Sequence, residues 1–104
     1  RAVTREGTSM QLARVVGSVV ATRKEENLVG LKLLLVRPLD EEGRESGNAL
    51  VSADAVGAGP DEIVLIAAGS SARQTVATDK KPIDSVIMAI VDSWYVGDAV
   101  KYKK

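Results

Sequence analysis

The side chains best suited to covalent chemistry are two adjacent serines, Ser70 and Ser71, followed closely by Arg73. A serine hydroxyl attacks a substrate only when a base takes its proton, and an arginine could then stabilise the oxyanion. The chain contains no His and no Cys, so Ser-His and Cys-His pairs are excluded, and no other base stands near these serines in a known pattern. We therefore assign the serines to helix capping and subunit contacts rather than to catalysis.

Carboxylates are the remaining groups that could carry acid-base or metal chemistry. Asp54, Asp84 and Asp92 could form pairs, but their spacing singles out no pair. Residues 40–48, DEEGRESGN, are acidic, yet they lack the D-x-D-x-D-G spacing of a calcium loop. Without His or Cys there is no ordinary zinc site either. The sequence thus predicts no catalytic residue, no metal site and no cofactor, and it indicates that the protein is not an enzyme.

A glycine-containing turn lies at residues 57–59, Gly-Ala-Gly, and Pro60 stiffens its exit. A dinucleotide-binding loop would need a third glycine where Glu62 stands, and a helix rather than a strand afterwards. A tight turn or a close contact between chains is the better interpretation. The apolar run of residues 63–68 then predicts a strand covered on both faces, and Ser70 or Ser71 could cap a short helix that runs toward Val76.

Length and composition describe one small domain that has no strong charge. The chain has 104 residues, 45% of them hydrophobic, with no Phe and only three other aromatic residues. Fourteen basic side chains balance fourteen acidic ones, so no net charge draws the protein to nucleic acid or to an anionic membrane. No apolar run approaches the roughly 20 residues that span a bilayer. We expect a soluble cytoplasmic protein that selects its partners by shape.

The pattern along the chain predicts a mainly antiparallel all-β domain, a five-stranded barrel of the oligonucleotide-binding type with one short helix. The expected strands are residues 11–23, 31–39, 49–53, 63–68 and 83–96. Acidic residues 40–48 are expected at a hairpin tip. We assign residues 1–9 to a flexible leader or a remnant of cloning, with a native arm that contacts a neighbour as the alternative. Residues 10–100 form the domain, and residues 101–104 form a solvated basic tail.

Three of the expected strands are apolar on both faces, although the chain offers too little helix to cover the outer side of a sheet. Apolar patches of several hundred Å² would then remain exposed unless another subunit buried them. The sequence therefore predicts a homo-oligomer with extensive interfaces.

Five segments, in this order and spacing, resemble the EutN/CcmL family of bacterial microcompartment vertex proteins. They are MQLARVVGSVVATRK, GLKLLLVRPLD, DAVGAG, GSSARQ and PIDSVIMAIVDS, and the resemblance covers Met10 to about Val96. It implies a five-stranded barrel that assembles into cyclic pentamers. Such pentamers cap the corners of a polyhedral protein shell built mainly of hexameric tiles, and they are not enzymes. The implied partners are other copies of this chain and hexameric and trimeric shell proteins, in the shell within the bacterial cytoplasm, with no nucleic acid and no membrane.

The resemblance also marks two segments as sites of subunit contact or as the lining of the axial opening, without deciding between these roles. The matching residues are Asp54, Gly57, Ala58 and Gly59 in the turn, and Ser70, Ser71, Ala72 and Arg73 at the start of the short helix.

Two questions stay open at the level of sequence. Trp94 has no counterpart that the resemblance explains, and we interpret it as a possible interface anchor because aromatic side chains often serve that role. The alternative function is that of an oligonucleotide-binding-type module for single-stranded nucleic acid or another ligand. The type of compartment and its cargo, whether a carboxysome or a catabolic organelle, is not specified.

Overall fold

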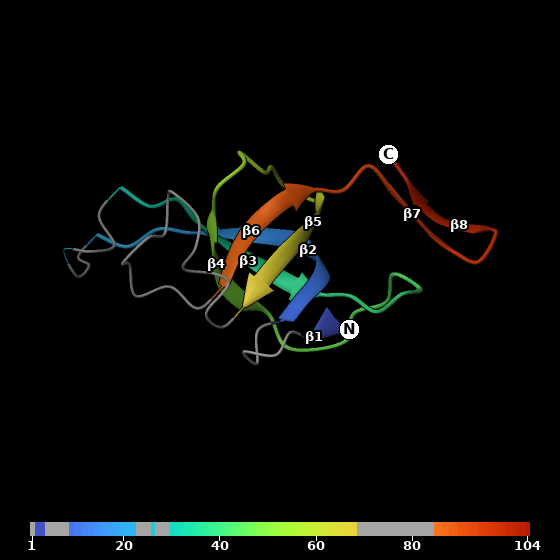
Figure 1. Ribbon diagram of the computed structural model, residues 1–104. Helices are drawn as coiled ribbons and strands as arrows, with labels where there is room; N and C mark the ends of the chain where they lie inside the picture. Colours follow the sequence, from blue (N-terminus) through green and yellow to red (C-terminus); the bar gives the residue numbers. More distant parts are fainter. Residues whose placement is uncertain (1, 4–8, 23–25, 27–29, 69–84) are drawn as a thin grey trace.

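The computed structural model describes residues 2–3, 9–22, 26, 30–68 and 85–104, and the elements they form are all strands (Figure 1). The strands are β1 (Ala2–Val3), β2 (Ser9–Val19), β3 (Leu33–Pro38), β4 (Leu50–Asp54), β5 (Ile63–Ala68), β6 (Ser85–Ile90), β7 (Ser93–Val96) and β8 (Ala99–Lys103). No helix within the described ranges is long and apolar enough to cross a membrane. The short helix predicted beyond Ser71 lies outside the described residues.

Five strands close into a barrel in the order β2-β3-β4-β6-β5, with β5 pairing back onto β2 and the short β1 added to the edge of β2. All pairs are antiparallel except β4 with β6, which are parallel. The parallel pairing of β4 with β6 is short. The buried hydroxyls of Ser52 and Ser85 add a hydrogen bond of 2.9 Å between these two strands. The predicted five-stranded barrel is therefore confirmed.

The long strand β2 closes the barrel because it pairs with two partners. Its first half, Ser9 to Arg14, pairs with β5, whereas Ala13 to Val19 pairs with β3. The register with β3 shifts between Val15 and Gly17. A bulge of this kind bends a strand and increases its twist, so β2 can pass from one side of the barrel to the other.

The barrel is filled by small branched side chains, as the lack of Phe requires. Its core holds eight buried residues, with Leu50 and Ile90 packed against them: Ala13, Val15, Leu34, Val36, Ala58, Val64, Ile66 and Ile87. A second cluster of Ala53, Ala67 and Val86 packs with Leu31 and Leu33.

The expected strand over residues 83–96 is wrong as a single element. Strand β6 ends at Ile90, and the N–H of Val91 then donates to the carbonyl of Ile63 at 2.8 Å. The chain continues into a separate two-stranded sheet, β7-β8, which reverses at Gly97 and Asp98, where Gly97 has a φ of 59°. Gly-Asp between two β-prone segments is a known hairpin signal. Residues 101–104, predicted as a solvated basic tail, instead belong to β8 as far as Lys103.

Candidate subunit-contact site

The turn after β4 is organised by the carboxylate of Asp54, whose side chain is 1% exposed. One oxygen, Oδ1, accepts hydrogen bonds from the N–H groups of Val56 and Gly57, each at 3.0 Å. The other, Oδ2, accepts one from the N–H of Ala58 at 3.0 Å. A single charged acceptor thus replaces the partners that three successive backbone donors would otherwise find in water. Gly57 adopts a φ of 78°, where glycine is favoured because it has no Cβ.

Lys32, from the segment before β3, supplies the charge that opposes this buried carboxylate. Its Nζ lies 3.7 Å from Oδ2 of Asp54 and donates to the carbonyl of Ala58 at 3.5 Å. The N–H of Asp54 in turn donates to the carbonyl of Lys32 at 2.9 Å. The Lys32 side chain is 61% exposed, so solvent screens the pair and its direct contribution to stability is small. Its role is to keep the Asp54 carboxylate compensated.

The far side of the turn is held by Glu62. Its Oε1 accepts a hydrogen bond from the N–H of Gly59 at 2.5 Å, and a Cβ at Gly59 would lie only 3.3 Å from the same oxygen. The other oxygen, Oε2, lies 2.6 Å from Nζ of Lys104. Ala58 points into the barrel core and is 1% exposed. The turn is therefore fixed at both ends and at its centre, while Val56 and Gly57 face outward.

The contact with Lys104, and then the N–H of Gly59, holds the pKa of Glu62 below the ordinary carboxyl value of 4.5. The same contact with Glu62 raises the pKa of Lys104 above its ordinary value of 10.5. The backbone N–H of Lys104 also donates to the carbonyl of Asp92 at 2.7 Å. Lys104 is thereby connected to the 54–62 turn.

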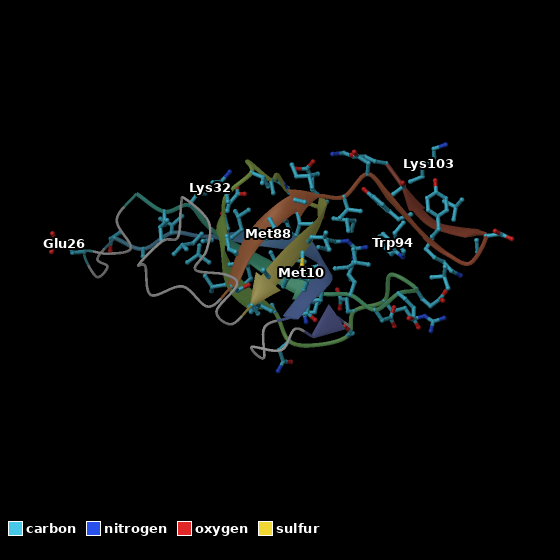
Figure 2. The ribbon with its side chains drawn as sticks, in the orientation of Figure 1. Met10, Glu26, Lys32, Met88, Trp94 and Lys103 are labelled. Atoms are coloured by element: carbon cyan, nitrogen blue, oxygen red, sulfur yellow. The ribbon has the colours of Figure 1, made fainter. Side chains whose placement is uncertain are left out.

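Trp94 holds the β7-β8 hairpin on the loop of residues 40–48, which carries the acidic cluster (Figure 2). Its indole N–H donates to the carbonyl of Glu41 at 2.8 Å, and its ring stacks on Tyr102 with centroids 5.3 Å apart. The ring also covers Gly43, where an added Cβ would lie 3.6 Å from it. An ion pair between Nζ of Lys101 and Oε1 of Glu42, at 2.7 Å, also holds the hairpin on this loop.

The structure brings together Asp54, Gly57, Ala58 and Gly59 in one turn, as the sequence predicted. The second predicted group, Ser70 to Arg73, lies outside the described residues. Trp94 lies elsewhere, on the hairpin, and the contacts described for it are within its own chain; a contact of Trp94 with another subunit stays a prediction.

Sequence reasoning missed Lys32 and Glu62, which complete the turn. The signal for Glu62 is weak but present: a carboxylate three residues after Gly59 can reach back to that residue's free N–H. Lys32 carries no such local signal, because it reaches the turn only through strand pairing.

The polar side chains of this site fix the shape of the turn. The Asp54 and Glu62 carboxylates are occupied by backbone N–H groups and lysines. Within the described ranges, no three acidic side chains converge to hold a metal ion. The closed barrel and its hydrogen-bonded turn define a small all-β protein with a rigid surface turn.

Comparison with known proteins identifies the family. The family described as "Ethanolamine utilisation protein EutN/carboxysome" matches residues 10–92, and the chain belongs to it. It is 47% identical over 96 residues to the carboxysome shell vertex protein CcmL of Nostoc sp., covering 91% of this chain and 95% of that protein. The solved structure of CcmL from Nostoc sp. superimposes with a TM-score of 0.85 at 46% identity, covering 90% of this chain and 99% of that one.

A second solved structure, "GrpN pentameric microcompartment shell protein from Rhodospirillum rubrum", has a TM-score of 0.76 at 43% identity. It covers 83% of this chain, whereas this chain covers 98% of it. The resemblance seen in the sequence segments is thus confirmed over the barrel.

Replacing Asp54 by asparagine tests the turn. Asp54→Asn keeps the shape of the side chain, but its amide group cannot accept from one of the three N–H donors and leaves Lys32 without its counter-charge. We expect the free energy of unfolding in urea to fall by about 1–3 kcal/mol. Asp61→Asn is the matched control, because Asp61 is exposed and its φ of 62° suits asparagine as well. Equal stability of the two variants would contradict the role given to Asp54.

The tie between Glu62 and Lys104 predicts a pH-dependent stability. A carboxyl with a lowered pKa stabilises the fold above its ordinary value and loses that effect as the pH falls through the folded-state pKa. A lysine with a raised pKa stabilises below its ordinary value and loses the effect above it. The difference in Tm between the protein and Glu62→Gln should therefore persist between pH 4.5 and pH 10.5. It should vanish well below pH 4.5. Lys104→Gln should follow the same profile, and a difference that stays constant into strong acid would refute it.

Proposed function

We propose that this chain is a structural shell protein whose pentamers cap the vertices of a bacterial microcompartment. The observation that carries the proposal is the similarity, over nearly the whole length of the relative, to a shell protein that is itself described as pentameric. The relative named as a shell vertex protein of the carboxysome supports the same role. The relatives come from carboxysomes and from other microcompartments, so the proposal covers either setting, within the shell in the bacterial cytoplasm.

A closed polyhedral shell requires five-fold units for a geometric reason. A flat layer of hexameric tiles cannot close on itself, and five-fold units introduce the curvature that closes it. A cyclic ring of five is built from one repeated head-to-tail contact that leaves no free end. The function is then assembly, and the chain catalyses no reaction.

The barrel offers apolar surface for the ring contact. Met10 and Met88 are each 39% exposed on the outside of β2 and β6, and Leu12 and Leu65 are half-buried beside them. Apolar side chains that gather on the outside of a small barrel are typical of a surface that another subunit covers. This supports the homo-oligomer expected from the two-faced strands.

Within this proposal the braced turn contributes contact surface. Asp54, Gly57, Ala58 and Gly59, together with Ser70, Ser71, Ala72 and Arg73, would serve subunit contacts or line the axial opening. Hexameric and trimeric shell proteins are the proposed partners around the ring. The rigidity of the turn supports this assignment, since a surface that is already fixed loses little conformational freedom when it binds.

A role in binding single-stranded nucleic acid finds little support. Such modules combine a basic groove with exposed aromatic rings on which bases stack. Here the net charge is zero, and two of the three aromatic rings, Trp94 and Tyr102, stack on each other.

The function is tested by co-expression with a hexameric shell protein from a microcompartment, followed by electron microscopy of the assemblies. With this chain present we expect closed polyhedral particles, and without it open sheets or tubes, because hexamers alone supply no five-fold corner. The control is the same hexamer co-expressed with an unrelated small β-barrel protein. Closed particles that form equally well without the chain, and that exclude it when it is present, would refute the proposal.

A further inference from the structure

Head-to-tail ring contacts require each subunit to carry two different surfaces that fit each other. The inference below rests on the proposed ring and concerns which surfaces these are. Two features of the described residues lie next to the loop of residues 40–48: a groove with both apolar and acidic lining residues, and a projecting hairpin with exposed apolar side chains.

The groove, of about 560 Å³, lies between β2, the end of β5 and the loop after β3. Four apolar side chains contribute to its lining, Met10, Leu12, Leu39 and Leu65, together with the polar residues Gln11 and Ser46. Asp40 and Glu41 line its acidic side, and Glu41 is exposed. Met10 marks its position on the barrel in Figure 2. This groove is therefore partly apolar and partly polar, with two acidic residues in its lining.

The projection is the β7-β8 hairpin, which forms a sheet of its own beside the barrel (Figure 1). Tyr95 and Val100 lie directly opposite each other across its two strands and are 57% and 55% exposed. Lys103 is exposed on the same hairpin. A two-stranded sheet is marginally stable in water by itself, so a partner for its apolar side chains would stabilise it. This projection thus exposes apolar side chains, with Asp98 at its turn and Lys103 near its far end.

One loop, residues 40–48, contacts both the groove and the hairpin. The loop that lines the groove through Asp40 and Glu41 also seats the hairpin, through the bond from Trp94 to the Glu41 carbonyl and the Lys101–Glu42 pair. A ring closes at a definite number of subunits only if the two halves of its contact keep a definite angle. Trp94 is therefore a positioning residue for such a contact.

We propose that the hairpin of one subunit, through Tyr95 and Val100, docks into the groove of a second copy of this chain, the next subunit of the ring. In this arrangement the exposed apolar side chains of the hairpin would meet the apolar part of the groove, and Lys103 would approach the exposed Glu41, so apolar contact and charge both favour this occupant.

Engineered cysteines test the contact, because the chain has no cysteine of its own. The double variant Met10→Cys/Tyr95→Cys places one thiol in the groove and one on the hairpin. After mild oxidation of the assembled protein we expect a ladder of linked subunits, up to five, on a non-reducing denaturing gel. Each single variant should run as a monomer, because the proposed contact joins Met10 of one subunit to Tyr95 of the next rather than two copies of the same residue.

Size-exclusion chromatography with light scattering on the same samples separates the two ways of failing. Rings of normal mass with no ladder, or with only an internal disulfide, would overturn the docking of the hairpin while leaving the shell function intact. A protein that forms no ring before any substitution would overturn the proposed function itself.

Val100→Thr provides a second test that leaves the fold intact, since threonine suits a strand as well as valine does. We expect subunit exchange between fluorescently labelled rings to become roughly tenfold faster, because the loss of an interface contact acts mainly on dissociation. Val51→Thr is the matched control, because Val51 lies on β4 at a similar exposure of 48%. Equal exchange rates for the two variants would overturn the proposal.

Discussion

The pairing of one strand, β2, with two partners is the constraint on which the rest of the structure depends. Because β2 pairs with β5 along its first half and with β3 along its second, the sheet closes on itself and encloses a core of valine, isoleucine, leucine and alanine. Closure uses the inward side chains of β2, such as Ala13 and Val15, for the core. The outward-facing side chains of β2, Met10 and Leu12 among them, remain available for contact with another molecule.

The apolar side chains that remain outside the core connect the fold to the proposed function. A small barrel without Phe fills its interior with short side chains, and part of its apolar surface stays outside, around Met10, Leu65 and Met88. The same architecture fixes the neighbouring loops from within: Asp54 holds one turn through three backbone N–H groups, and Trp94 fastens the hairpin to the loop of residues 40–48. A protein that must repeat one contact at a constant angle needs such braced surfaces more than it needs reactive groups.

Local patterns in the sequence predicted much of this arrangement. Residues 63–68 were identified as a strand with both faces covered because the run is continuously apolar, and the turn at residues 54–59 was identified from its glycines. The C-terminal hairpin was missed because residues 83–96 are β-prone almost without interruption. The pairing of β6 with β5 ends after Ile90, with a last hydrogen bond from Val91 to Ile63, and the local pattern does not encode where this pairing ends. Lys32 was missed for the same reason, since only the pairing of β3 with β4 brings it to Asp54.

The most direct test of the account is to count the subunits by native mass spectrometry of the purified protein. The chain has a mass of 11.0 kDa, so a closed ring of five should appear at about 55 kDa, with little monomer at micromolar concentration. That result would join the stoichiometry of a vertex to the barrel and to its family. A monomer, a dimer or a hexamer as the dominant species would contradict the account, because none of these can form the five-fold corner of a shell.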